Sequence, residues 1–336
     1  MTRIALVGAG RIGTHHARTI AREVEGLDLV LLADPLAPRL DDLAAELGVP
    51  AITRDSSGTV SADVDAVVIT SPAARHVELI EACAAAGRHV FTEKPLALTV
   101  ADAERAASAA GEAGIILQIG FNRRFVEAWA SAARAVRAGS VGSVQRIGSL
   151  TRDPGPFTAD PARIAPATIF NETLIHDFDT LNWLNAGSEP VEVYALAEAL
   201  IRPDAEDSGF RDSAVVTIRY DNGALATAEA SFCAMYGYDL RGEVLGSRGM
   251  VQMGEPTSSG ARLFTAAGKS VATAGTDTSR YHAAYRDELR VFARAIAGED
   301  VDYPGAADGV RAQRIAAAAI RSAAENRPVT IEEVSR

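Results

Sequence analysis

An apolar run at residues 3–8 leads directly into three glycines with the spacing Gly8-x-Gly10-x-x-Gly13. The run predicts a buried β-strand, and the residues that follow have the pattern of a helix. A second apolar strand ends at Asp34, 21 residues after Gly13. This order of strand, glycine-rich turn, helix, strand and acid predicts a dinucleotide-binding βαβ unit, because each part has a defined place in such a site.

Each glycine of the turn has its own steric reason. Gly8 permits a tight turn, Gly10 lets the backbone approach a pyrophosphate, and Gly13 lets helix and strand pack closely. The helix start, at Arg11 and Ile12, supplies free N–H groups and the positive end of the helix dipole. An ordinary glycine-rich turn is the alternative, but it leaves the surrounding strand, helix and acid unexplained.

Asp34 bears on the choice of cofactor. A carboxylate at this position accepts hydrogen bonds from the adenosine ribose hydroxyls and repels a 2′-phosphate, so the sequence favours NAD over NADP. Arg39 lies close enough in the sequence to weaken that preference. The alternative for Asp34 is a turn residue before Pro35, which does not explain its distance from the glycines.

Composition and charge exclude several classes of protein. The length of 336 residues predicts two domains, and 48% hydrophobic with 23% charged residues is typical of a folded chain. A net charge of −11 argues against nucleic acid or an anionic membrane as partner. Cys83 and Cys233 stand alone, so we expect neither a disulfide framework nor a metal site. With no predicted membrane span or signal peptide, we expect a cytoplasmic protein.

Strands and helices alternate along the first third of the chain, which predicts a doubly wound parallel sheet of the Rossmann type. The expected strands are 3–8, 28–33, 65–70, 88–92 and 115–119, and the expected helices are 11–24, 36–47, 73–86 and 99–113. After residue 121 strand-like runs follow one another closely, which predicts an α+β domain with a mostly antiparallel sheet. Its expected strands are 144–151, 190–198, 213–220, 224–232, 240–247 and 249–253, and its expected helices are 125–138, 281–297 and 307–325.

These patterns divide the chain into three parts. We predict an NAD-binding domain over 1–120, a second domain over 121–305, and a C-terminal part, 306–336, whose helix packs back on the first domain. The run 224–232 alternates alanines with larger residues, which gives the strand a small-residue face. That face predicts either a homo-oligomer interface or cover by the domain's own helices.

Ligands of open α/β sheets bind beyond the carboxyl ends of the strands. Three segments are expected there, namely Thr70-Ser71-Pro72 with His76, Phe91-Thr92-Glu93-Lys94-Pro95, and Gly120-Phe121-Asn122-Arg123-Arg124. Lys94 stands out, because a lysine beside a dinucleotide site can stabilise an alkoxide during hydride transfer. Most lysines are solvated surface residues, but the position after a sheet strand and the flanking Glu93 and Pro95 favour the functional interpretation. A cis bond before Pro95 would aim the lysine.

A second group of polar residues is expected on one helix. Glu172, His176 and Asp179 fall at i, i+4 and i+7, which is one face of an α-helix. A histidine between two carboxylates is suited to proton transfer near neutral pH. A solvated polar face is the alternative, and a metal site with Asp177 is disfavoured because Asp177 points away from the others.

Together these motifs resemble the glucose–fructose oxidoreductase / inositol dehydrogenase / MocA family. The resemblance rests on the glycine-rich turn, the Thr-Ser-Pro-x-x-x-His of 70–76, the Glu-Lys-Pro of 93–95 and the acid-x-x-x-His of 172–176, and it covers nearly the whole chain. The bacterial inositol 2-dehydrogenases are favoured within the family by Phe121-Asn-Arg-Arg-Phe, Arg152-Asp153-Pro154, His176-Asp-Phe-Asp179 and Tyr236-Gly-Tyr-Asp239.

The resemblance implies a role for each matching residue. Lys94 would contact the substrate hydroxyl and the nicotinamide side, His176 would be the general base, and Glu172 its partner in the proton relay. The cofactor would lie against Gly8, Gly10, Arg11, Ile12, Gly13, Asp34, Ser71, Pro72, His76, Glu93 and Lys94. Arg124, Asp153, Asp179 and Tyr236 would hold the ring hydroxyls, and the chain would form a dimer or tetramer.

Glu172 departs from the family pattern, which has aspartate there. One extra methylene moves the carboxylate by about an ångström, and catalytic geometry is sensitive on that scale. We therefore predict NAD-dependent oxidation of a polyol, with myo-inositol as the first candidate. The alternatives are a sugar or keto-sugar dehydrogenase or reductase of the same family, and a non-catalytic NAD-binding regulator. The regulator is disfavoured because both Lys94 and His176 are present.

Overall fold

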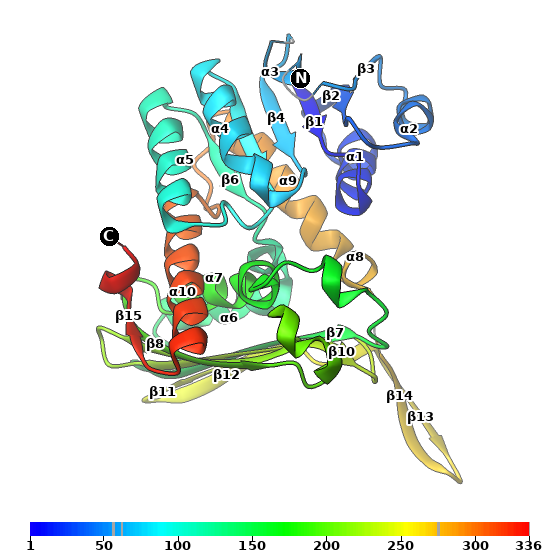
Figure 1. The fold of residues 1–336 in the computed structure, drawn as a ribbon. Helices are drawn as coiled ribbons and strands as arrows, with labels where there is room; N and C mark the ends of the chain where they lie inside the picture. Colours follow the sequence, from blue (N-terminus) through cyan, green and yellow to red (C-terminus); the bar gives the residue numbers. More distant parts are fainter. Residues whose placement is uncertain (56–57, 62, 274–275, 336) are drawn as a thin grey trace. The chain divides into compact units, whose positions relative to one another are not determined.

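The computed structural model describes residues 1–55, 58–61, 63–273 and 276–335. The chain forms two compact units, which Figure 1 shows coloured along the sequence. The first unit comprises Met1–Phe125 and Ala283–Gln313, and the second comprises Val126–His282 and Arg314–Arg336.

The first unit is built on a six-stranded parallel sheet with the order β3-β2-β1-β4-β5-β6. Its strands are β1 (Thr2–Val7), β2 (Leu27–Ala33), β3 (Ala51–Thr53), β4 (Ala66–Ile69), β5 (His89–Thr92) and β6 (Leu117–Ile119). The central strands are buried on both faces, as continuous apolar runs require. The strand order reverses beside β1, which is the place where open α/β sheets bind ligands. The predicted doubly wound parallel sheet is confirmed.

Helices connect the parallel strands, and a 3₁₀ turn follows the last of them. They are α1 (Arg11–Glu23), α2 (Leu40–Leu47), α3 (Gly58–Ser61), the 3₁₀ turn η1 (Ala73–Arg75), α4 (His76–Ala85), α5 (Val100–Ala113) and the 3₁₀ turn η2 (Asn122–Phe125). Helix α9 (His282–Ile296) joins them from far along the chain, because its Leu289 and Phe292 are fully buried in the same core as Ile4 and Leu6 of β1. The short elements β3 and α3 are not among the sequence predictions.

The second unit contains a seven-stranded, mostly antiparallel sheet with the order β12-β11-β7-β10-β9-β8-β15, in which β7 and β10 run parallel. Its strands are β7 (Val144–Pro154), β8 (Pro190–Glu198), β9 (Ser213–Tyr220), β10 (Leu225–Ala234), β11 (Asp239–Gly246), β12 (Gly249–Met253) and β15 (Val329–Thr330). A separate hairpin of β13 (Thr257–Thr265) and β14 (Gly268–Thr273) was not predicted. The α+β class of this domain is confirmed.

Helices of the same unit cover one face of this sheet (Figure 1). They are α6 (Glu127–Arg137), α7 (Leu174–Leu184) and the later turns of α10 (Ala306–Glu325), while the shorter elements are α8 (Asp277–Arg280), the π-helical turn η4 (Ile169–Thr173) and the 3₁₀ turns η3 (Pro161–Arg163), η5 (Pro203–Ser208) and η6 (Ile331–Val334). Ala226, Ala228 and Ala230 of β10 are at most 2% exposed, and α7 packs against their strand. The small-residue face is therefore covered by the domain's own helices, which is the second of the two alternatives that the sequence left open.

The C-terminal part divides differently from the sequence expectation. Helix α9 and the start of α10 belong to the first unit, whereas Arg314–Arg336 belongs to the second. The later part of α10 is tied to the sheet because the Ala195 N–H donates to the buried Ser322 hydroxyl at 3.0 Å. Strand β15 then pairs with β8. We expected the helix of 306–336 to pack on the first domain, and the structure places only its start, up to Gln313, in the first unit.

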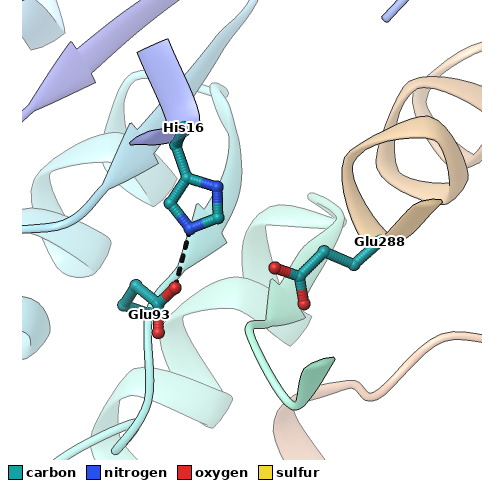
Figure 2. A group of neighbouring side chains, drawn as sticks. All are labelled: His16, Glu93 and Glu288. Carbon is teal, nitrogen blue, oxygen red and sulfur yellow. Dashed lines mark hydrogen bonds and ion pairs between the residues drawn. The ribbon is translucent and has the colours of Figure 1, made fainter. Parts of the chain in front are cut away.

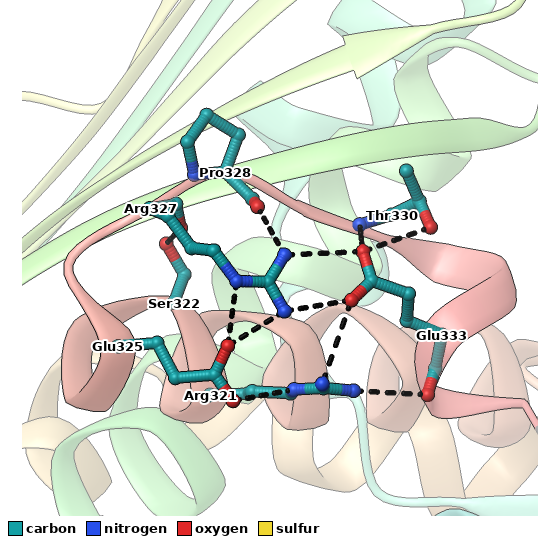
Figure 3. Close-up of polar contacts among 7 residues, drawn as sticks. All are labelled: Arg321, Ser322, Glu325, Arg327, Pro328, Thr330 and Glu333. Carbon is teal, nitrogen blue, oxygen red and sulfur yellow. Dashed lines mark hydrogen bonds and ion pairs between the residues drawn. The ribbon is translucent and has the colours of Figure 1, made fainter.

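A cluster of charged residues joins the end of α10 to the residues that follow it (Figure 3). Arg327 donates to Glu325 at 2.6 Å and to Glu333 at 2.7 Å, and Arg321 pairs with Glu325 at 2.8 Å. Glu333 also accepts the Thr330 N–H at 3.0 Å, which completes a capping box at η6. These contacts fix the turn between α10 and β15. Separately, among the helices that the structure describes, none is long and apolar enough to cross a membrane.

Candidate active site

Close packing requires two glycines of the turn after β1. Gly8 has a φ of +99°, and a Cβ there would lie 2.6 Å from the Ser71 backbone nitrogen. A Cβ on Gly13 would lie 1.8 Å from the Gly8 carbonyl oxygen. The Thr70 hydroxyl donates to that carbonyl oxygen at 2.6 Å, which joins this turn to the segment after β4. Both positions therefore exclude a larger residue, as the sequence predicted.

Gly10 has the opposite environment. A Cβ at Gly10 would meet nothing within 4 Å among the described residues. Gly10 precedes α1, and this helix start has no side-chain cap in the described structure and no acid in its first turn. Because the first N–H groups of a helix lack partners within it, this end can receive a pyrophosphate. The open space and the uncapped helix fit the phosphate contact predicted at Arg11 and Ile12.

A pocket of about 610 Å³ lies beside this turn and is lined in part by Asp34 and Arg39. Asp34 Oδ2 accepts the Ala9 N–H at 2.7 Å, and Oδ1 accepts the N–H groups of Leu36 and Ala37 at 2.7 and 2.8 Å. Asp34 thus shapes the turn that follows it and also presents a charged carboxylate to the pocket. The two interpretations of Asp34 from the sequence are compatible.

Two arginines of the pocket, Arg18 and Arg39, have acidic partners. Arg39 pairs with Asp42 at 3.1 Å, and Arg18 pairs with Glu46 at 2.7 Å. The hydrogen bond and charge of Arg18 lower the pKa of Glu46. These pairs balance the arginines, while Asp34 keeps a negative charge on the pocket wall. This charge distribution fits the unphosphorylated ribose of NAD better than that of NADP.

The segment after β4 meets the segment after β5 through His76. The two ring nitrogens of His76 lie 2.8 Å from the Pro95 carbonyl oxygen and 2.9 Å from the Ser71 carbonyl oxygen. Burial lowers the pKa of His76, although both carbonyl groups act in the other direction. His76 therefore ties these two segments together, and its contact with a cofactor stays a prediction. Ser71 is half-buried and Pro72 is exposed at the same edge.

Lys94 follows β5 at the carboxyl edge of the parallel sheet, where it is half-buried. Its bond to Pro95 is cis. Glu93, directly before it, is buried and receives the Nε2–H of His16 at 2.7 Å (Figure 2). Burial alone would raise the pKa of Glu93, but the hydrogen bond and charge of His16 and the charge of Lys94 hold it below the ordinary value. Glu93 is thus an ionised carboxylate behind the lysine.

The segment with Glu172 and His176 is helical but not a regular α-helix. Glu172 lies in the π-helical turn η4, and His176 and Asp179 lie in α7. A π turn is wider than an α turn, so Glu172 does not keep the regular i, i+4 relation to His176 that the sequence predicted. Glu172 is exposed, His176 is half-buried and Asp179 is 1% exposed. Single π turns occur frequently at functional sites.

Asp177 points to the sheet rather than to this polar group. It is fully buried and accepts the hydroxyls of Ser149 and Thr151 of β7 at 2.5 and 2.7 Å. This orientation agrees with the exclusion of Asp177 from a site with His176. Asp177 instead anchors α7 on the sheet, and so helps to place His176.

The remaining predicted substrate residues make contacts within their own units. Arg124 pairs with Asp308 of α10 at 2.8 Å in the first unit. In the second unit the Tyr236 hydroxyl donates to Asp239 at 2.7 Å and accepts from Arg152 at 2.9 Å. Asp153 is half-buried near the end of β7. The contacts of these side chains with a substrate stay predictions.

Two family models match the chain. The model of the GFO/IDH/MocA oxidoreductase family for the NAD-binding Rossmann fold matches residues 2–121, and that for the C-terminal alpha/beta domain matches residues 165–331. The chain belongs to the GFO/IDH/MocA family. This membership confirms the resemblance drawn from the sequence motifs and the NAD-binding domain at the glycine-rich turn.

Relatives in this family are similar over most of the chain. The scyllo-inositol 2-dehydrogenase (NAD(+)) of Bacillus subtilis is 35% identical over 88% of this chain and 86% of its own. The myo-inositol 2-dehydrogenase of Thermotoga maritima is 34% identical over 99% of each chain. The Lactobacillus casei scyllo-inositol dehydrogenase, solved with bound NAD(H) and scyllo-inositol, has a TM-score of 0.94 at 27% identity, over 99% of both chains.

Within this GFO/IDH/MocA fold the predicted residues form two groups. The glycine-rich turn, Asp34, Ser71, His76 and Lys94 gather at one edge of the sheet of the first unit. Glu172, His176 and Asp179 follow one another on η4 and α7 of the second unit. The cofactor residues and the predicted acid–base residues therefore belong to different units.

Sequence reasoning missed His16 and Glu288. Glu288 lies on the buried stripe of α9, together with Tyr285, Leu289 and Phe292. An acid in an apolar i, i+3, i+4, i+7 stripe is a signal that could have been read, because charged residues are rarely buried without a partner. His16 offered no comparable signal, since it follows another histidine in an ordinary helix.

Proposed function

We propose that this protein oxidises a secondary alcohol of a cyclic polyol with NAD, and that an inositol is its substrate. The observation that carries the proposal is that a chain similar over its full length to inositol 2-dehydrogenases has both Lys94, at the edge of an NAD-binding sheet, and His176. Carboxylates at Asp153, Glu172 and Asp179 suit a neutral polyol, because they accept hydrogen bonds from hydroxyls and repel anions.

We assign each part of the glycine-rich turn and its neighbours to one part of the cofactor. The α1 N-terminus holds the pyrophosphate beside Gly10, and Asp34 holds the adenosine ribose. Ser71 adds a hydroxyl at the same edge, because its Oγ is buried without a hydrogen-bond partner among the described residues. NAD, when bound, supplies the acceptor for the hydride that leaves the alcohol carbon.

The proton and the developing charge are handled by the protein. His176 takes the hydroxyl proton, and the Lys94 ammonium stabilises the oxygen as it becomes an alkoxide. The Glu172 carboxylate orients the His176 ring and stabilises the positive charge that the ring gains when it takes the proton. Arg124, Asp153, Asp179 and Tyr236 fix the ring hydroxyls, so that one carbon faces the cofactor.

The test is NADH formation with NAD⁺ and a panel of myo-, scyllo- and chiro-inositol, glucose and xylose. Lys94→Ala should lower kcat by about a hundredfold or more, as loss of a charge-stabilising donor does. NAD affinity, measured by calorimetry, should stay near that of the unaltered protein. Turnover of an inositol that survives Lys94→Ala would contradict the assignment of the lysine.

A sugar or keto-sugar is the second candidate substrate, and Glu172 is the observation that favours it. Its longer side chain and its π-helical turn set the carboxylate differently from an aspartate on a regular helix. Glu172→Asp distinguishes the two substrates. Higher activity with an inositol in this variant would mean that Glu172 is adapted to another substrate, and lower activity would support Glu172 as the working partner for inositol.

We also propose that a second copy of this chain covers the open face of the seven-stranded sheet. Leu196 and Val215 lie opposite each other on β8 and β9 and are each about half exposed there. Leu225 is also about half exposed, at the start of β10. Apolar side chains grouped in this way are typical of subunit contacts. Light scattering of the protein and of a Val215→Glu variant tests the assembly. A dimer or tetramer and a cytoplasmic location stay predictions.

A further inference from the structure

Three polar side chains meet in the core of the first unit (Figure 2). His16 comes from α1, Glu93 from the segment after β5 and Glu288 from α9, and one nitrogen or oxygen of each lies within 4.8 Å of the others. His16 and Glu288 are fully buried, and Glu93 is 7% exposed. No part of the mechanism above uses Glu288.

Within the cluster the Glu93 carboxylate accepts hydrogen bonds, whereas the Glu288 carboxyl group has none among the described residues. Glu93 accepts the His16 Nε2–H at 2.7 Å and the N–H of Lys94 at 3.2 Å. The two oxygens of Glu288 have no hydrogen-bond partner among the described residues, although the side chain points to Glu93 (Figure 2). A buried ionised carboxylate without a partner is very unfavourable, whereas a carboxyl group that carries a proton is a donor.

The charges of the cluster indicate where the proton lies. Burial raises the pKa of Glu288 well above its ordinary value, and the nearby charge of Glu93 adds to this effect. Glu93 stays ionised because of His16 and Lys94. Two carboxylates this close cannot both carry a charge in a buried site, so one of them keeps its proton.

We propose that Glu288 is a protonated positioning residue, which donates a hydrogen bond to the Glu93 carboxylate and, with His16, holds the backbone of Lys94 in place. The link to catalysis rests on the proposed function of Lys94. The Glu93 carboxyl group also packs closely on Gly120, because a Cβ added there would lie 3.2 Å from the carboxyl carbon. One carboxyl oxygen of Glu288 and one of Glu93 already lie within 4.8 Å of each other, and the proposed hydrogen bond requires a shorter distance between them.

A metal ion is the other occupant that one imidazole and two carboxylates suggest. Two observations disfavour it. The His16 nitrogen that would bind a metal is already engaged with Glu93 at 2.7 Å. The other nitrogen, Nδ1, is buried without a partner among the described residues, whereas the second nitrogen of a metal-bound histidine almost always donates a hydrogen bond.

The groups that face Glu288 are known on each element of the cluster. They are His16 on α1 and Glu93 after β5. The charge of Lys94 acts on Glu93. Phe91 and Tyr285 lie against the His16 ring at 5.5 and 5.6 Å between centroids, so the site is lined by aromatic rings. The charge that acts on Glu288 is that of Glu93, whereas the charges of His16 and Lys94 act on Glu93.

The first test compares Glu288→Gln with the unaltered protein by thermal unfolding across pH. The amide keeps a donor but cannot ionise. Because the folded-state pKa of Glu288 is raised, the unaltered protein loses stability as the pH rises above about 4.5, the value of the unfolded chain, and the variant does not lose this contribution. The variant should therefore melt about 3 °C or more above the unaltered protein near pH 8, and the gap should close toward pH 4.

If Glu288 were ionised or bound a metal ion, the opposite difference in melting temperature would be expected. Glu288→Gln would then melt below the unaltered protein near pH 8, and for a metal site added zinc or a chelator would shift the melting temperature of the unaltered protein alone. Either result overturns the proposal. This test needs no enzymatic activity, so it does not depend on the substrate.

The second test examines the link to Lys94. The sequence contains only two lysines, Lys94 and the exposed Lys269, so competitive acetylation measures the reactivity of one against the other. Glu288→Met removes the donor and should change the Lys94-to-Lys269 ratio about threefold or more, whereas Glu288→Gln should leave it unchanged. An unchanged ratio in Glu288→Met would contradict the positioning role, even if the pH test succeeds.

Kinetics with a polyol that the protein oxidises then separate this inference from the proposed function. Glu288→Met should lower kcat about tenfold with little change in NAD affinity, and Glu288→Gln should restore it. Turnover that is equal in the unaltered protein and in Glu288→Met would leave the polyol dehydrogenase standing and reject the positioning residue. Absence of turnover on every polyol would reject the proposed substrate class, while the pH and acetylation tests would still decide the state of Glu288.

Discussion

The C-terminal cluster and the buried cluster of the first unit use the same kinds of side chain in opposite ways. At the end of α10 and beyond it, Arg321 and Arg327 each pair with both Glu325 and Glu333, and all four side chains are accessible to water. In the first unit Glu93 has one side-chain donor, His16, and Glu288 has none among the described residues. The surface cluster has more ion pairs, but the loss of one partner should lower the free energy of unfolding more in the buried cluster.

The difference teaches that the number of contacts is a poor measure of their importance. An exposed pair exchanges good hydration for an attraction that water and salt weaken, so its net effect is small. A buried carboxylate that loses its partner cannot recover the hydration that it gave up. We therefore expect the largest effects where the structure shows the fewest hydrogen bonds.

The strongest test of this comparison is His16→Leu. The change removes the side-chain donor to Glu93 and leaves a buried carboxylate, which should reduce the free energy of unfolding by about 3–5 kcal/mol. Urea unfolding followed by circular dichroism measures the change. His16→Gln, which keeps a donor of similar reach, is the matched control. A loss below about 1 kcal/mol in His16→Leu would mean that Glu93 is not held as an ion.

Gly120→Ala tests how firmly Glu93 is held. The added Cβ would lie 3.2 Å from the carboxyl carbon, and His16 keeps that carboxyl from moving, so we expect a cost of about 1–3 kcal/mol. In the His16→Leu background the carboxyl group is released, and the cost should shrink. A double-mutant cycle measures this coupling. Equal costs in both backgrounds would show that His16 does not fix the position of Glu93.

Much of this organisation was predictable from the sequence, and the exceptions have physical causes. The spacing Gly8-x-Gly10-x-x-Gly13 and the acid at Asp34 have local steric and electrostatic reasons, so they indicated the fold and the cofactor. The π turn at Glu172 was not predictable, because it depends on how η4 meets the sheet. Nor was Glu288 assigned, since its contact with Glu93 joins residues 195 positions apart in the sequence.

At the C-terminus, Arg327→Ala tests the weak side of the comparison. Arg327 donates to both Glu325 and Glu333, yet all three are exposed enough for water to replace these contacts. We expect the melting temperature to fall by about 2 °C or less, and by less still in high salt. Tryptophan fluorescence reports this unit, because Trp129 and Trp183 both belong to it. A larger, salt-independent fall would mean that the cluster acts as part of the core.

The smallest effect should appear only as a dependence on pH. The hydrogen bond of Arg327 and the Thr330 N–H lower the pKa of Glu333 to about 2, from 4.5 in the unfolded chain. A lowered pKa in the folded state means that Glu333 contributes stability above about pH 4.5 and loses it as the pH falls toward about 2. Glu333→Gln lacks this contribution. The melting temperatures of the two proteins should therefore differ slightly at neutral pH and converge in acid. A gap that persists at about pH 2 would show that Glu333 acts through the packing of η6 rather than through its charge.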